Sequence, residues 1–492
     1  MKTPSTELFD LVHSLRQNEK RYFNVFAKTL GGSSAKKNYT ELFSQLSKQE
    51  EYDERYIRNK KIGVKHFKRL KHYTSGMVMR SLENFHGESS AEIIVNRFLT
   101  QAEILYRKKQ YSLLRKVLSK AFAMAVERDM LQYINPLLLF EFKASISLRN
   151  TTHTLHQFTS KALLRITKDC GRWMELRRLD VMFWNIIQTR DIVTAREKQE
   201  LRAIASNAIK VLGSGNNSYS ISREASNVLG LCYRFSGDTQ KSYFWRKKLI
   251  EVIEKDKKFL HERSAEYVVA IGNLLNLCLE MKMNDDVEKL FHKANDYVSV
   301  LPTKYIDQAL DDRFCNLQNS YISFLFANKK YEEAIHYGEI LYNKLRKHSY
   351  DFINSLVPLL LRTIVFSAFY TRNFKMANRY YNLWLRQDEP AIDQLWKKLF
   401  GLVLFFEQGE RDLLFYRCRA FRYALRKEKK TNPFMYELEK FISGKILKTI
   451  NKKEEAEAFR IFFELISKKG KIIDSAKSAG YFNYADWLKM KN

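Results

Sequence analysis

A run of basic residues near the N-terminus has the composition of a phosphate-binding surface. In RNKKIGVKHFKRLKHY, residues 58–73, seven of the sixteen side chains are Lys or Arg. Four of them fall mostly away from the apolar stripe of the expected helix: Lys61, Lys65, Lys68 and Arg69. Cations on one helix face can neutralise backbone phosphates, but Asn59 is the only Asn or Gln in the run, so base reading is not predicted. A core-facing helix with a solvated charged side explains the same pattern.

A second basic region covers residues 415–453, where twelve Lys or Arg stand against three Glu. Three arginines in this region are predicted to share one helix face: Arg419, Arg422 and Arg426. The opposite, apolar face is expected to consist of Phe415, Cys418, Phe421 and Leu425. The arginines are candidates for contact with RNA, DNA or an acidic partner, and a solvated helix end is the alternative.

No group of residues has the spacing of a catalytic or metal site. His153 and His156 are three residues apart and can share a helix face, but no Cys or carboxylate lies close by in sequence to complete a metal site. The sequence has no P-loop, no HExxH motif and no complete glycine motif for a dinucleotide. Its five cysteines are dispersed, so we expect reduced, mostly buried thiols. We therefore predict a protein that is not an enzyme, with no cofactor and no metal.

The composition bounds the class of protein. Hydrophobic residues make up 45% of the 492 residues, and the six prolines and 17 glycines are few enough to favour an all-helical chain. The net charge of +30 attracts polyanions, although a generally basic surface gives the same number. Apolar runs are far shorter than the roughly 20 residues that span a bilayer, and the N-terminus lacks a signal-peptide core. We expect a cytoplasmic protein without membrane contact, and the sequence leaves its oligomeric state open.

Residues 1–90 are predicted to form an N-terminal basic helical domain. A first helix is expected from about residue 6 to residue 30, with GGSSAKKN at 31–38 breaking it. A short helix follows at 39–46, and a longer helix carries the basic run and ends near Phe85. Apolar residues at three- to four-residue spacing give these helices one buried face.

From residue 91 onward, helical segments recur in pairs that are joined by short turns. The clearest pair is ASNVLGLCYRFSGDTQKSYFWRKKLI, residues 225–250. Leu229, Gly230 and Tyr233 match the L-G-x2-Y core of a tetratricopeptide repeat, and Gly237 stands at the turn. The chain therefore resembles tetratricopeptide-repeat proteins as a class. Gly230 is expected to let the two helices approach closely, and Tyr233 to fill the space between them.

The resemblance implies an all-α, right-handed α-α superhelix over residues 91–460, with capping helices at 461–492. Further pairs are expected at 272–295, 321–341 and 364–385. The equivalent second-helix positions are Ser242, Val287, Ala334 and Ala377. They are 45, 47 and 43 residues apart, whereas the standard repeat has roughly 34 residues. Longer helices or extra turns between pairs would account for the difference.

In tetratricopeptide proteins, the first helix of each pair lines a concave groove. Carried over to this sequence, the resemblance implies six groove residues: Asn227, Arg234, Asn273, Asn276, Asn319 and Arg362. Amide side chains both donate to and accept from a peptide backbone, and Arg can hold a carboxylate through two hydrogen bonds. Such a lining suits an extended peptide with an acidic group or a free C-terminus. The alternative is that asparagine is simply common on the exposed helix faces of this chain.

The sequence thus predicts a non-enzymatic scaffold that binds a protein or peptide partner through its concave groove. The alternative is a regulatory protein that associates with RNA or DNA through basic surfaces. Salt dependence separates the two, because phosphate-driven binding weakens steeply as the salt concentration rises.

Overall fold

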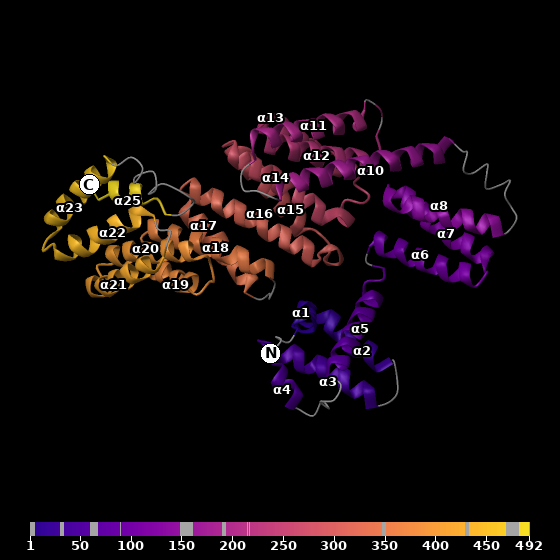
Figure 1. The fold of residues 1–492 in the computed structure, drawn as a ribbon, viewed down its shortest axis with the longest axis horizontal. Helices are drawn as coiled ribbons and strands as arrows, with labels where there is room; N and C mark the ends of the chain where they lie inside the picture. Colours follow the sequence, from indigo (N-terminus) through magenta and orange to yellow (C-terminus); the bar gives the residue numbers. More distant parts are fainter. Residues whose placement is uncertain are drawn as a thin grey trace. The chain divides into compact units, whose positions relative to one another are not determined.

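The computed structural model describes residues 5–29, 34–59, 67–88, 90–147, 161–188, 193–213, 215, 217–346, 351–428, 432–468 and 482–491. All regular secondary structure in these residues is helical, and they contain no strand. The chain divides into two compact units, residues 1–317 and 318–492, and the division falls inside α16 (Gln308–Ala327). Each unit is described by itself (Figure 1).

Unit 1 begins with five helices that share a core of their own. They are α1 (Glu7–Ser14), α2 (Gln17–Thr29), α3 (Ser34–Lys48), α4 (Glu54–Asn59) and α5 (Phe67–Phe85), at the indigo end of the colour bar in Figure 1. Val12, Phe23, Leu42, Ile57 and Val78 are each fully buried in this core. The core ends at α5, since its apolar cluster draws only on residues before Phe85.

The single first helix expected at residues 6–30 is wrong. Leu15 has extended backbone torsion angles, φ −70° and ψ 133°, so α1 ends there and α2 starts at Gln17. The Glu19 carboxylate accepts from the Arg16 N–H at 2.6 Å and so caps the new helix. Because Leu15 is itself buried, the apolar spacing continues across the break and hides it in the sequence. Likewise α3 starts at Ser34, inside the stretch that was expected to be a break.

The rest of unit 1 consists of helices that pack on their neighbours in sequence. They are α6 (Ala91–Arg107), α7 (Tyr111–Glu127), α8 (Leu131–Ser147), α10 (Lys161–Ile187), α11 (Ala195–Leu212), α12 (Tyr219–Ser236), α13 (Thr239–Lys255), α14 (Ser264–Glu280) and α15 (Asn284–Ser299). Short 3-10 turns, His261–Arg263 and Thr303–Tyr305, precede α14 and α16.

Unit 2 continues the same organisation from the second half of α16. It contains α17 (Tyr331–Leu345), α18 (Asp351–Tyr370), α19 (Phe374–Leu385), α20 (Ala391–Glu407), α21 (Arg411–Lys427), α22 (Pro433–Gly444), the 3-10 turn η4 (Ile446–Lys448), α23 (Lys452–Ser467) and α25 (Tyr484–Lys489). The chain is therefore a many-helix all-α protein with helices stacked pair after pair.

The turns of α6–α7, α12–α13, α14–α15, α16–α17, α18–α19 and α20–α21 share one backbone design, which also occurs at Asp129 between α7 and α8. One residue of the turn has a left-handed φ, between 56° and 91°, at Lys109, Gly237, Lys282, Lys329, Arg372 and Gly409. The N–H of the next residue donates to the carbonyl five residues earlier, at 2.9–3.1 Å in all six turns. This is the Schellman ending of a helix, which satisfies carbonyl groups that the last turn would leave unpaired.

The common turn defines a register for the pairs. Five residues after the left-handed residue, the second helix places a side chain with at most 1% exposure: Leu114, Ser242, Val287, Ala334, Ala377 and Leu414. Two or three residues join the helices within a pair, but eight residues join α13 to α14 and α15 to α16, and five join α17 to α18 and α19 to α20. The connections between pairs therefore lengthen the repeat, as the wide spacing of the motif suggested.

Close contact between α12 and α13 depends on Gly230. A Cβ atom at Gly230 would lie 3.0 Å from the Cγ atom of Arg246, and the Ser242 hydroxyl donates to the Gly230 carbonyl at 2.7 Å. Tyr233 is half-buried and packs against the core beside this contact, and Arg246, which is 2% exposed, lies directly against Gly230. Arginine can do this because its long aliphatic stem packs like an apolar side chain.

The C-terminal helix α25 covers apolar surface of unit 2. Trp487 and Leu488 are buried, and the indole Nε1 of Trp487 donates to the Glu407 carboxylate at 2.7 Å. The Trp487 ring lies 5.4 Å from the Phe459 ring on α23, centroid to centroid. The predicted boundary at residue 460 falls inside α23, so the start of a separate capping segment stays a prediction.

Candidate binding surfaces

Three predicted groove residues lie on neighbouring first helices of unit 1. Asn227 is on α12, and Asn273 and Asn276 are on α14. All three are half-buried, and their amide groups make no hydrogen bond within the described part of the chain. A half-buried amide without a protein partner keeps its donors and acceptor available to a ligand.

Ion pairs connect these first helices on either side of the asparagines. The Arg223 guanidinium on α12 lies 2.8 Å from the Glu266 carboxylate on α14. Arg234, another predicted groove residue, pairs with Glu280 at the other end of the same two helices. The Arg234 guanidinium is therefore already paired with the Glu280 carboxylate, so Arg234 links α12 to α14 as well as being a groove candidate.

A buried acidic pair continues this network toward α10. Glu224 is 1% exposed and accepts from Arg177 at 2.9 Å and from Arg223 at 2.8 Å. Burial, together with the nearby Glu224 charge, raises the pKa of the Asp180 carboxyl above its usual range. Ion pairs thus join the three first helices α10, α12 and α14 to one another.

The remaining two groove candidates belong to unit 2. The Asn319 Oδ1 atom on α16 is buried and has no hydrogen-bond partner in the described residues. Burial lowers the pKa of the Arg362 guanidinium on α18, with Glu389 and Asp393 acting in the opposite direction. Asn227, Asn319 and Arg362 each stand ten residues before a left-handed turn residue, so they occupy one register position. The six candidates therefore form a group of four in unit 1 and a group of two in unit 2.

The N-terminal basic run is partly described. Lys68 and Arg69 are exposed on α5, while Lys61 and Lys65 lie outside the described residues. Lys71, from the same run, is hydrogen-bonded within the protein. Its Nζ atom donates to the Ser5 carbonyl at 2.6 Å and to the Tyr52 hydroxyl at 2.9 Å. The described part of this helix therefore offers two exposed cations at its N-terminal end.

The three candidate arginines of the second basic region lie on α21, whose buried face matches the expected one except at one residue. Arg419 and Arg426 are exposed on α21, but the Arg422 side chain donates to the buried Glu439 carboxylate at 2.7 Å and to Ser443 at 2.8 Å. Placing Phe415 on the apolar face is wrong, since its side chain is 55% exposed. The buried face consists of Leu414, Cys418, Phe421 and Leu425. Cys418, Phe421 and Leu425 are buried as expected, and Leu414 takes the place in the core that was expected for Phe415.

The exposed side of α21 carries two aromatic residues that were not predicted from the sequence. Tyr416 and Tyr423, seven residues apart, are 65% and 63% exposed on the same side of α21 as Arg419 and Arg426. The Lys427 Nζ atom lies 4.5 Å from the centre of the Tyr423 ring. The seven-residue spacing of Tyr416 and Tyr423 was visible in the sequence. Tyrosine occurs in cores as well as on surfaces, so the spacing alone did not predict their exposure.

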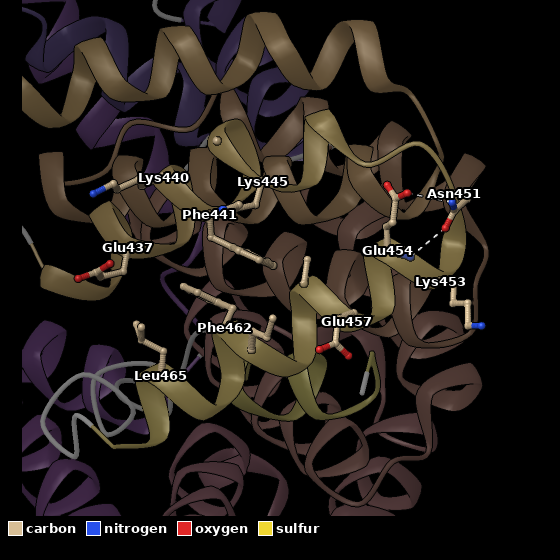
Figure 2. Close-up of a pocket in the computed structure, with 13 residues that line it drawn as sticks. Glu437, Lys440, Phe441, Lys445, Asn451, Lys453, Glu454, Glu457, Phe462 and Leu465 are labelled. Carbon is tan, nitrogen blue, oxygen red and sulfur yellow. Dashed lines mark hydrogen bonds between the residues drawn. The ribbon is translucent and has the colours of Figure 1, made fainter.

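A groove between α22 and α23 was also missed (Figure 2). Its volume is about 1000 Å³. Its floor holds the stacked rings of Phe441 and Phe462, with centroids 4.1 Å apart. Ile461 and Leu465 on α23 line it and are 53% and 45% exposed. No local motif signals this groove, because its two walls come from separate helices.

The cysteine side chains are not poised for reaction. All five are free and buried. Burial raises the pKa of the Cys232, Cys278 and Cys418 thiols to about 12, and that of Cys170 to about 11. These thiols stay protonated at neutral pH, so they serve as small apolar side chains in the helix contacts.

The described residues contain no cluster of three His, Cys, Asp or Glu that could hold a metal ion, and His153 and His156 lie outside them. Within that same part of the chain, no helix combines the length and apolarity needed to cross a membrane. Neither protein-family models nor curated protein sequences match the chain.

Proposed function

We propose that the chain is a tetratricopeptide-like scaffold, with a right-handed superhelical path, that binds an extended segment of a partner protein. The binding surface in unit 1 is the row of first helices α12 and α14. One observation carries the proposal: on adjacent first helices, the amide groups of Asn227, Asn273 and Asn276 have no hydrogen-bond partner among the described residues. The repeated left-handed turn supports the repeat class, because it places each pair in the same register.

Ion pairs between α12 and α14 restrict the movement of the two helices that carry the three asparagines. Arg223–Glu266 and Arg234–Glu280 join the two helices on both sides of the asparagines. A receptor whose helices are already fixed loses less entropy when it binds a flexible peptide. Each amide can then donate to a backbone carbonyl and accept from a backbone N–H of an extended chain, for about 0.5–1.5 kcal/mol per hydrogen bond.

The test is affinity purification with nuclease present, using the wild type and the variant Asn227→Ala, Asn273→Ala, Asn276→Ala, followed by quantitative mass spectrometry. Three lost amides are expected to cost about 3 kcal/mol, so partners bound there should fall roughly 100-fold. Asn295→Ala is the matched control, since Asn295 is a half-buried asparagine on the second helix α15. If every captured protein survives the triple substitution, the surface assignment is wrong.

A second candidate function is binding of single-stranded RNA or DNA on α21. The observation that favours it is the mixed face of exposed Tyr416 and Tyr423 with Arg419 and Arg426. Tyrosine rings stack on bases of any sequence, and arginines neutralise the phosphates between them.

Fluorescence anisotropy with a labelled 15-mer of deoxythymidine, at several salt concentrations, tests this candidate. Arg419→Gln with Arg426→Gln should make the salt dependence less steep, and Tyr416→Ala with Tyr423→Ala should weaken binding by about 1–3 kcal/mol per stacked base. The variant Lys68→Gln, Arg69→Gln on α5 tests in the same assay whether the N-terminal basic run contributes to binding. Unchanged affinity and salt dependence in the α21 variants would remove this function.

A further inference from the structure

The guanidinium group of Arg246 on α13 is buried without a counter-charge of its own. Its side chain is 2% exposed, and its Nε and Nη1 atoms have no hydrogen-bond partner among the described residues. The third nitrogen, Nη2, is not enclosed in the same way, and it makes no hydrogen bond or ion pair within that part of the chain. Because moving a charge out of water is costly, buried charges are normally paired. Arg246 lacks such a partner.

Packing alone does not require an arginine at this position. Arg246 stands nine residues after Gly237, the left-handed residue of its turn. The corresponding residues in five other pairs are uncharged and buried: Leu118, Phe291, Gly338, Tyr381 and Cys418. An apolar residue at position 246 would therefore fill the space without burying a charge. The charge of Arg246 needs a reason other than packing.

The surroundings of Arg246 have an excess of positive charge. Two charged groups act on its guanidinium, Arg234 on α12 and Glu280 on α14, and these two form an ion pair with each other. Burial, together with the Arg234 charge, lowers the pKa of Arg246 to about 10, while the Glu280 carboxylate acts in the opposite direction. Arg246 is therefore still charged at pH 7. One carboxylate stands against two guanidinium groups, an imbalance that favours one further negative charge.

This cluster lies beside the asparagine surface of the proposed function. The helices α12, α13 and α14 that carry it pack together (Figure 1). Asn227, Gly230 and Arg234 follow one another at three- and four-residue spacing, so they share one side of α12. A Cβ atom at Gly230 would lie 3.0 Å from the Cγ atom of Arg246 and 3.9 Å from its Nε atom. The Arg246 side chain therefore contacts α12 at the level between Asn227 and Arg234.

We propose that Arg246 and Arg234 together bind one oxyanion, a carboxylate or a phosphate group, where α12, α13 and α14 meet. The Glu280 carboxylate accepts from the Nη2 atom of Arg234 alone, so the other two nitrogens of that guanidinium have no partner among the described residues. Guanidinium groups suit this role because their planar N–H groups match the geometry of carboxylates and phosphates.

The oxyanion has two possible sources with the same chemistry. In the first, it is an acidic side chain of the bound peptide segment, and in this form the inference rests on the proposed function. The contact would then add charge recognition to the hydrogen bonds of the asparagines. In the second, it is a free phosphate group, whose binding is independent of the asparagine surface.

The first arm of the test measures thermal unfolding of the full chain in sodium phosphate and in sodium chloride at equal ionic strength. Phosphate should raise the melting temperature of the wild type, because an anion that binds only the folded chain stabilises it. Arg246→Leu should fold, since Leu118 occupies the corresponding position on α7, and it should lose most of this rise. Arg234→Gln, at a half-buried position, should also reduce the rise.

Arg460→Leu is the matched control, because Arg460 is an exposed arginine on α23 and its replacement makes the same change in net charge. This variant should keep the full phosphate response. The absence of a response in the wild type, or an equal response in Arg246→Leu, would overturn the proposal.

The second arm identifies the source of the oxyanion. Linear peptides from a phage library are selected on the wild type, with counter-selection on Arg246→Leu. Enrichment of Asp or Glu would assign a peptide carboxylate, and the best labelled peptide should bind Arg246→Leu roughly tenfold or more weakly in fluorescence polarisation. A phosphate response without this enrichment would assign a free phosphate group. The variant Asn227→Ala, Asn273→Ala, Asn276→Ala should keep the phosphate response, so failure of this site and failure of the proposed function are distinguishable.

Discussion

Two adjacent lysines in the turn between α6 and α7 are expected to respond oppositely to the same substitution. Lys109 has φ 57°, in the left-handed region, whereas Lys108 has φ −80° and ψ 0°. Both side chains are exposed, so replacing either removes little contact area. Lys109→Gly should stabilise the turn and Lys108→Gly should destabilise it.

The magnitude follows from the backbone. A residue with a Cβ pays about 1–2 kcal/mol in the left-handed region, and glycine does not. Glycine loses about 0.5–1 kcal/mol more backbone entropy on folding than a residue with a side chain. The difference leaves Lys109→Gly about 0.5–1 kcal/mol more stable. Lys108→Gly gains no strain relief and loses about 0.5–1 kcal/mol.

Hydrogen exchange measures this effect locally, which suits a 492-residue chain that need not unfold in one step. The informative amides are those of Lys109, which donates to the Tyr106 carbonyl at 3.0 Å, and Gln110, which donates to the Leu105 carbonyl at 2.9 Å. After correction for intrinsic rates, the Gln110 amide should exchange about two- to fivefold more slowly in Lys109→Gly. Faster exchange in Lys109→Gly, or slower exchange in Lys108→Gly, would refute the strain argument.

Three further substitutions probe buried contacts. Lys397 is fully buried, pairs with Glu389 and donates to two backbone carbonyls at 3.0 Å. Lys397→Met leaves the Glu389 charge without its partner, so it should lower the urea midpoint by the equivalent of about 3–5 kcal/mol. Adding Glu389→Gln should recover part of this loss. A Cβ at position 401 would overlap the Tyr381 hydroxyl, so Gly401→Ala should cost about 1–3 kcal/mol in the same assay. The folded-state pKa of Asp180 is raised, so this carboxylate costs stability once the pH exceeds its unfolded value. Asp180→Asn should therefore raise the melting temperature at pH 7, and the gain should shrink as the pH falls toward 4; an equal gain at both pH values would contradict the assignment.

The sequence predicted the repeated elements well where the signal was local. The all-helical class followed from composition and apolar periodicity. Gly230 was found through its match to the L-G-x2-Y motif, and a Cβ atom there would lie 3.0 Å from the Cγ atom of Arg246. The second-helix positions from Ser242 to Ala377 fall at one register because each follows the same turn. Signals of this kind lie within one helix pair, so a single sequence contains them.

Features that depend on the rotation of a helix or on distant partners were missed. Leu414 and Phe415 are adjacent apolar residues, and periodicity alone does not decide which one enters the core. The break at Leu15 is hidden because a buried leucine fits both a helix and an extended residue. The groove between α22 and α23 depends on how two helices diverge, and the partners of Arg234 and Arg422 depend on packing.

The uneven connections between pairs indicate where this chain tolerates growth. Two or three residues close every turn within a pair from α12 to α21, and their hydrogen bonds leave no room for an extra residue. The connections from α13 to α14 and from α15 to α16 already contain eight residues each. Phe259 and Leu301 in these connections are buried, so an epitope would preserve both flanking pairs only at exposed residues such as Lys257 and Val300. The same insertion beside Lys329 would separate two helices that bury each other's apolar surface.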